Sequence, residues 1–95
     1  MKAKLIYRAR RRYDDGYIAE FKIWDVPSPV LGSAHSLKYS LFYGRKGERI
    51  VGYDNERGKG DHKHIREVEY RYSFTTVEQL IADFTADVKA QRGQK

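Results

Sequence analysis

The chain contains no cysteine, which excludes disulfides, thiolate metal sites and cysteine nucleophiles and suits a reducing cytosol. It also lacks any apolar run near the ~20 residues that a membrane-spanning helix needs. Arginines follow the opening segment Met1–Tyr7, where a secretion signal would continue with apolar residues. These absences predict a cytoplasmic protein with no membrane partner.

Acidic residues are the minority among the charged ones: 13 aspartates and glutamates stand against 19 lysines and arginines, which gives a net charge of +6. This balance favours an anionic partner, of which nucleic acid is the commonest. An acidic protein would satisfy the same charge, and many small basic domains are merely soluble. Hydrophobic residues make up 40% of the 95 residues, so we expect a folded protein with one domain over residues 1–95.

Alternating apolar and basic residues predict a half-buried strand over Lys4–Tyr13. Its two faces carry Leu5, Tyr7, Ala9 and Tyr13 on one side and Lys4, Arg8, Arg10 and Arg12 on the other. Asp14-Asp15-Gly16 is typical of a tight hairpin turn, and Tyr17–Val26 then forms a second strand. Further alternation predicts the strands Leu37–Tyr43, Glu48–Tyr53 and Val68–Phe74, with a glycine-broken loop over 54–64.

A helix is predicted after the last strand, because Thr75 and Glu78 have the spacing of a capping box. Apolar residues then recur at helical spacing, at Val77, Leu80, Ile81, Phe84 and Val88. The polar tail from Gln91 is expected to fray. The sequence therefore predicts an α+β fold: a single antiparallel sheet of about five strands with one C-terminal helix packed on one face.

The segment from Tyr53 to His64 holds the residues best suited to chemistry. His62 and His64 are two apart, so in a strand both imidazoles point to one face. One could remove the proton from a ribose 2′-hydroxyl while the other protonates the leaving 5′-oxygen, without a metal or cofactor. Arg57 and Lys59 could stabilise the phosphate, and Asp54 could orient a histidine.

Other interpretations of this segment stay open. Gly58 and Gly60 permit close approach to a ligand, but the Gly-Lys-Ser/Thr ending of a phosphate-binding loop is missing. The two histidines with Asp54 or Asp61 could ligate a metal, although no spacing is diagnostic. They could also be exposed at a strand edge with no role, and His35 is expected to be incidental.

Arg8, Arg10 and Arg12 belong to the densest basic run of the chain. With Tyr7 and Tyr13 they could follow a nucleic-acid backbone and offer faces for stacking. The alternatives are a solvated outer strand face, or a surface for an acidic partner.

The chain carries a pattern of elements in a fixed order: Tyr53-Asp54-Asn55, a variable loop, His62-Lys63-His64-Ile65, a strand and a helix that starts with Thr-x-x-Glu. This pattern resembles the TumE-like toxins of prokaryotic type II toxin–antitoxin modules. The resemblance implies growth inhibition, neutralised by a cognate helix-turn-helix antitoxin, and a ribonuclease is the usual expectation for small basic toxins of this sort. By this resemblance, the family motif marks Asp54, Asn55, His62 and His64 in this chain.

The leading hypothesis is an RNA-cleaving toxin, a hydrolase that needs no metal. Its catalytic residues would be His62, His64 and Asp54, and its substrate-binding residues Arg57, Lys59, Asn55, Arg8, Arg10 and Arg12. One alternative is a non-catalytic basic module that binds nucleic acid or an acidic partner. Another is a metal-dependent phosphodiesterase or nucleotidyl-transfer enzyme that uses Asp54, Asp61 and the histidines. An exposed edge strand could also pair two copies into a homodimer.

Overall fold

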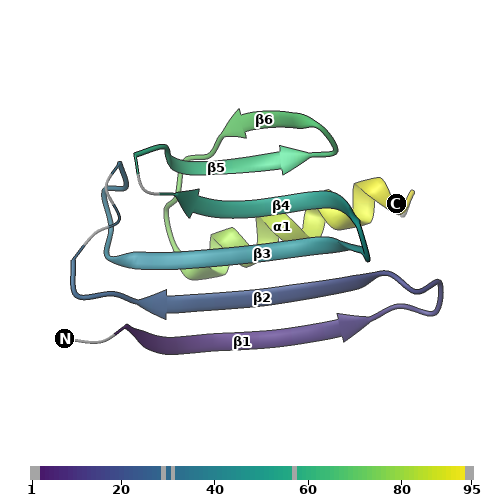
Figure 1. Cartoon of the computed structure of the whole chain (residues 1–95), viewed down its shortest axis with the longest axis horizontal. Coiled ribbons are helices and arrows are strands. Elements are labelled where there is room, and N and C mark those ends of the chain that lie inside the picture. The colour runs from purple at the N-terminus through teal and green to yellow at the C-terminus, as the bar shows by residue number, and fades with distance from the viewer. Residues whose placement is uncertain (1–2, 29, 31, 57, 94–95) are drawn as a thin grey trace.

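One antiparallel sheet followed by one helix makes up the architecture seen in the computed structural model, which describes residues 3–28, 30, 32–56 and 58–93. Each strand pairs with its neighbours in sequence, so the spatial order is that of the chain (Figure 1). The elements are β1 Lys4–Arg12, β2 Ile18–Asp25, β3 Leu37–Arg45, β4 Glu48–Glu56, β5 Gly60–Ile65, β6 Val68–Arg71 and α1 Val77–Gln91. The predicted α+β class is confirmed, with six strands instead of about five.

The additional strand comes from the segment that was expected to be a loop. Gly58 and Gly60 adopt positive φ angles of 85° and 75°, which only glycine reaches without strain. The chain therefore reverses tightly after β4 and returns as β5, and pairing places Asp54 opposite His62. The predicted strand Val68–Phe74 is shorter than expected, since β6 ends at Arg71.

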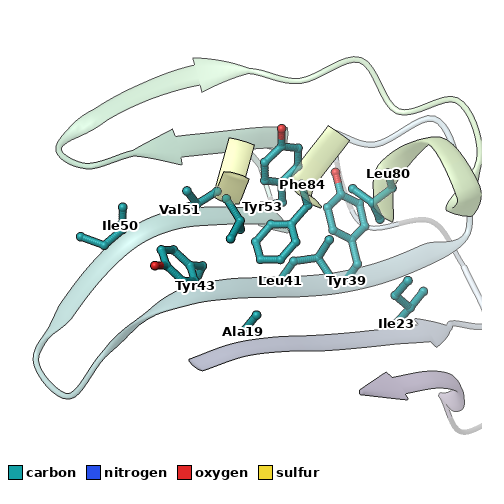
Figure 2. Close-up of a cluster of buried hydrophobic side chains, with 11 residues drawn as sticks. Ala19, Ile23, Tyr39, Leu41, Tyr43, Ile50, Val51, Tyr53, Leu80 and Phe84 are labelled. Carbon is teal, nitrogen blue, oxygen red and sulfur yellow. The ribbon is translucent and has the colours of Figure 1, made fainter. Parts of the chain in front are cut away.

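The core lies between α1 and one face of the sheet. Figure 2 shows side chains from β2, β3, β4 and α1 that meet there. The buried set is Ala19, Ile23, Tyr39, Leu41, Tyr43, Ile50, Val51, Tyr53, Leu80, Phe84 and Val88. The helical stripe thus packs as predicted, and burying each large apolar side chain contributes about 1.5–3 kcal/mol.

The beginning of α1 differs from the prediction by one residue. The N-cap is Thr76, whose hydroxyl accepts a hydrogen bond from the Gln79 amide at 3.1 Å, so the predicted cap at Thr75 is wrong by one residue. At the other end α1 ends at Gln91, where the polar tail was expected to begin, and Arg92 forms an ion pair with Asp15 at 3.0 Å. No helix in the described ranges is long and apolar enough to cross a bilayer.

The opposite face of the sheet is left uncovered, since α1 lies behind the sheet in Figure 1. Cross-strand register aligns one row of side chains over this face: Arg8, Lys22, Ser40, Asp54, His62 and Arg71. The next row is Arg10, Glu20, Phe42, Gly52, His64 and Glu69. A bulge between Leu5 and Tyr7 separates these two residues onto opposite faces, contrary to the predicted alternation.

Two glycines of the β4–β5 turn provide a matched test of this geometry. A Cβ on Gly60 would lie 2.6 Å from the Gly32 carbonyl oxygen, whereas a Cβ on Gly58 would meet nothing within 4 Å. We expect Gly58→Ala to cost about 1–2 kcal/mol through its positive φ alone. Gly60→Ala should cost more, because the backbone of Gly32 must also move. Thermal melts of the two variants check this, and equal melting temperatures would contradict it.

Candidate functional site

His62 and His64 lie on the uncovered face of the sheet, as two residues of one strand spaced by two should. Their ring centroids are 5.2 Å apart and their planes are nearly perpendicular, at 86°. The sequence-based expectation that the two imidazoles share a face therefore agrees with the structure.

Each imidazole lies against a carboxylate from a neighbouring strand. His62 Nε2 is 2.6 Å from Asp54 Oδ1, across the β4–β5 pair. His64 Nε2 is 2.9 Å from Glu69 Oε1, across the β5–β6 pair. We call these four residues the dyad cluster. The contact of Asp54 with a histidine was expected from the sequence, whereas Glu69 was missed, because only the β5–β6 register brings it opposite His64.

His62 is the more enclosed of the two histidines, with 4% of its side chain exposed. Its Nδ1 lies 3.2 Å from the Gly60 carbonyl oxygen, which can only accept a proton. Its Nε2 faces Asp54, although this contact lacks hydrogen-bond alignment. Both ring nitrogens of His62 therefore face oxygen acceptors.

The two ring nitrogens of His64 differ in their contacts. Nε2 contacts Glu69, while Nδ1 is buried and has no hydrogen-bond partner among the described residues. The Glu69 carboxylate is itself kept ionised, because a hydrogen bond from Lys59 lowers the pKa of Glu69. An imidazole that is oriented by a carboxylate through one nitrogen can accept a proton at the other, which is the geometry of a general base.

The structure does not bring all of the predicted phosphate-binding cations to the two histidines. Lys59 reaches the dyad cluster through Glu69, with 3.2 Å between Lys59 Nζ and Glu69 Oε1. Arg57 lies outside the described residues. Arg8, Arg10 and Arg12 are on the same face but on β1, four strands from β5. Strand spacing puts them roughly 19 Å from the histidines, so they cannot contact the same phosphate.

Two arginines that the sequence did not single out lie next to the dyad cluster. Arg71 is directly opposite His62 in the β5–β6 pair. The Arg49 side chain lies across Gly52, with its Nε 3.3 Å from where a Cβ of Gly52 would be, and Gly52 is opposite His64. In the part of the chain that the structure describes, neither arginine makes an ion pair or side-chain hydrogen bond. Both are therefore available to an anion.

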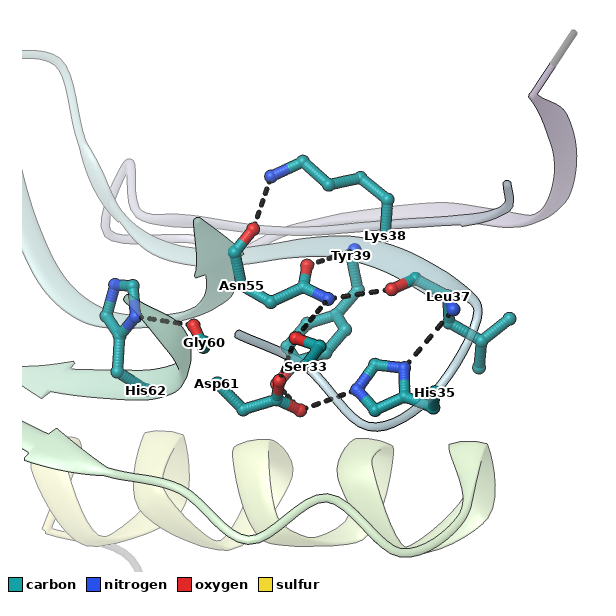
Figure 3. Close-up of polar contacts among 9 residues, drawn as sticks. All are labelled: Ser33, His35, Leu37, Lys38, Tyr39, Asn55, Gly60, Asp61 and His62. Carbon is teal, nitrogen blue, oxygen red and sulfur yellow. Dashed lines mark hydrogen bonds and ion pairs between the residues drawn. The ribbon is translucent and has the colours of Figure 1, made fainter. Parts of the chain in front are cut away.

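Asn55 was expected to bind substrate, but its side chain is fully buried. Its Oδ1 accepts a hydrogen bond from the Tyr39 amide at 3.0 Å, and its Nδ2 donates to the Leu37 carbonyl at 2.7 Å (Figure 3). Nδ2 also donates to Ser33 Oγ at 3.3 Å. These bonds fasten the β2–β3 connection to β4, which is a structural role and leaves no atom of the amide for a substrate.

Asp61 points away from His62, toward the β2–β3 connection (Figure 3). It accepts hydrogen bonds from the Ser33 and Tyr39 hydroxyls, and its Oδ2 is 2.6 Å from His35 Nε2. His35 Nδ1 accepts from the Leu37 amide at 3.2 Å, so Nε2 carries the proton and donates to Asp61. His35 was expected to be incidental, and that expectation is wrong. Asp61, in turn, does not join His62 and His64.

The residues that could hold a metal ion are His62, His64 and Glu69. Their nearest ligand atoms all lie within 4.8 Å of one another. Two imidazole nitrogens and a carboxylate oxygen form a donor set suited to zinc and similar divalent ions. The same four-residue arrangement can thus support proton transfer or, with Glu69 as a ligand, metal binding.

A family model described as Toxin TumE matches residues 2–92 of the chain. The match spans the basic strand β1 and the whole dyad cluster. No curated protein and no solved structure matches the sequence.

The buried Asn55 side chain allows a test that separates a structural role from a substrate-binding role. We expect Asn55→Ala to lower the free energy of unfolding by about 2–4 kcal/mol, because the Tyr39 amide and the Leu37 carbonyl lose their partner. Asp54→Asn, at the neighbouring and partly exposed position, should change it by less than about 1 kcal/mol. Chemical denaturation measures both. An Asn55→Ala protein of unchanged stability but weakened RNA binding would show that the amide contacts substrate.

Proposed function

The chain belongs to the TumE toxin family, and on that premise we propose that it is a toxin that cleaves RNA, with the dyad cluster as its catalytic site. One observation carries the proposal. On the uncovered sheet face, His64 has a buried Nδ1 with no hydrogen-bond partner among the described residues, while the adjacent His62 ring sits between two oxygen acceptors. Acid–base cleavage of RNA requires two groups close together, one to accept a proton and one to donate it.

The proposed chemistry assigns His64 as the general base. Its buried Nδ1 takes the proton from the ribose 2′-hydroxyl through a bridging water, and the 2′-oxygen attacks the adjacent phosphorus. The bond to the 5′-oxygen breaks, and His62 supplies the proton that this leaving oxygen needs. Because only 4% of the His62 side chain is exposed, that proton passes through a bridging water. The products are a 2′,3′-cyclic phosphate and a free 5′-hydroxyl.

Charged residues around the dyad cluster have distinct proposed roles. Arg49 and Arg71 stabilise the negative charge that develops on the phosphate. Lys59 holds Glu69 ionised, and Glu69 fixes the orientation of the His64 ring. The arginines of β1 guide the RNA backbone into place from a distance, as sequence-independent phosphate contacts do.

Membership of a toxin family implies an antitoxin partner. We propose that this partner is a helix-turn-helix protein, and that toxin and antitoxin meet in the cytoplasm. An acidic surface on the antitoxin would complement the basic face and block access to the dyad cluster. The exposed edge strands β1 and β6 give two copies of the toxin a means of pairing as a homodimer.

A second candidate function uses the same residues around a metal ion. The donor set of His62, His64 and Glu69 would hold a divalent cation that polarises the phosphate and activates a water. This would make the protein a metal-dependent phosphodiesterase. Unlike acid–base cleavage, such a reaction needs no 2′-hydroxyl and would also cut DNA.

Substitutions in the dyad cluster should separate chemistry from folding. His64→Ala is expected to lower RNA cleavage by at least ~100-fold, the usual loss of a general base, and to abolish growth inhibition. Glu69→Gln should lower cleavage by about 10-fold, because the ring loses its orienting charge. Glu67→Gln is the matched control, since Glu67 is a nearby exposed carboxylate with no described contact. Full toxicity of a His62→Ala, His64→Ala double variant would eliminate the proposal.

Chelation distinguishes the two candidate functions. If proton transfer by the histidines suffices, cleavage of RNA should persist unchanged in excess chelator. The measurement is the rate of product formation before and after dialysis against chelator, with a 2′-deoxy substrate as a parallel control. Loss of activity that zinc or manganese restores, together with cleavage of the 2′-deoxy substrate, would favour the metal-dependent function.

A further inference from the structure

A pocket of about 370 Å³ lies where the β2–β3 connection meets the β4–β5 turn. The lining residues that matter here are His35, Lys59, Gly60, Asp61, Arg71 and Phe74. Its volume is at the lower end of the range for small-molecule sites, which suits a ligand the size of one nucleotide. No role assigned so far uses this pocket.

The pocket and the dyad cluster are adjacent because they share two residues. Gly60 lines the pocket, while its carbonyl oxygen accepts the hydrogen bond from His62 Nδ1 (Figure 3). Arg71 also lines the pocket and lies opposite His62 in the sheet. A group held in the pocket would therefore be next to the proposed catalytic histidines.

The side chains around the pocket combine aromatic faces with positive charge. The Phe74 and His35 ring centroids are 4.1 Å apart, and the buried Tyr39 ring packs behind them, 5.9 Å from Phe74 and 6.1 Å from His35. Arg71 contributes a guanidinium that has no partner among the described residues. Aromatic faces bind nucleobases by stacking, and guanidinium groups bind phosphate. Together they fit a nucleotide better than a purely apolar or purely anionic ligand.

The aromatic wall is fixed in place before any ligand binds. Asp61 joins Ser33, His35 and Tyr39 in one hydrogen-bonded network. Burial, with the nearby Asp61 charge, raises the pKa of Tyr39, so its hydroxyl stays protonated and continues to donate. Close backbone packing of Gly32 on Gly60 fixes the floor of the pocket. A preformed wall lowers the entropic cost of binding.

We propose that this pocket holds one unpaired nucleotide of the RNA substrate beside the scissile phosphate, with its base on the Phe74–His35 wall and its phosphate at Arg71. The position beside the scissile bond rests on the proposed function. The nucleotide must be unpaired, because a base inside a duplex cannot reach an aromatic wall without leaving the stack. The pocket therefore restricts the toxin to single-stranded sites and contributes to its sequence preference.

The test measures binding separately from cleavage. The probe is a fluorescent single-stranded oligonucleotide with 2′-fluoro sugars, which lacks the attacking hydroxyl, and binding is followed by anisotropy. We expect Arg71→Gln to weaken binding by about 5–10-fold and to lower the log–log salt slope by about 0.7, the value for one phosphate on a single strand. Phe74→Leu should weaken binding by a similar factor, through lost stacking. A blunt duplex of the same sequence should bind more weakly than the single strand.

Arg45→Gln is the matched control, because Arg45 is an arginine at the far end of β3, paired with Glu48; it should bind as the parent does. Thermal melts must show that Phe74→Leu folds, and Arg71→Gln gives an independent readout because Arg71 is exposed. Parent-like affinity in both pocket variants would overturn the proposal even if the protein cleaves RNA. Conversely, if RNA is never cleaved but both variants weaken binding, the pocket still binds a nucleotide and only the proposed catalysis fails.

Discussion

The register of the β4–β5 hairpin is the constraint on which the rest of the candidate site depends. Asp54 faces His62 only because Gly58 and Gly60 close the turn with positive φ angles and Gly60 packs on the Gly32 backbone. A slip by one residue would exchange the faces of β5. His62 would then point toward α1 and Asp61 outward, and both the dyad cluster and the hydrogen-bonded network behind the pocket would be lost.

Three consecutive residues connect the two halves of the site. Gly60 forms the floor of the pocket, Asp61 anchors the network with His35 on one face, and His62 contacts Asp54 on the other. Because successive side chains of a strand point to opposite faces of the sheet, Asp61 and His62 lie on different faces. The buried residues of the network therefore help to position the dyad cluster, since any shift of Asp61 is transmitted to both neighbours along the backbone.

The dyad cluster lies on a sheet face without a helix, because α1 covers only the other face. Tyr53 and Tyr72 donate hydrogen bonds to Asp87 and Asp83 of α1, which fixes the helix over β4. The other face keeps a row of polar side chains that runs from Arg8 on β1 to Arg71 on β6. The row begins and ends with an arginine, while Ser40 and Asp54 lie between them.

The sequence by itself determined the fold class, the Asp14-Asp15-Gly16 hairpin, the apolar stripe of α1 and the shared face of His62 and His64, because all of these follow from local periodicity and turn chemistry. It also indicated the sixth strand too weakly to be recognised, since closely spaced glycines are typical of a loop. Tertiary structure alone decided that Glu69 and Arg71 join the histidines, that Asn55 is buried and that His35 meets Asp61. These contacts join residues far apart in sequence, and their geometry depends on cross-strand register and on the path of the β2–β3 connection, neither of which a single sequence specifies.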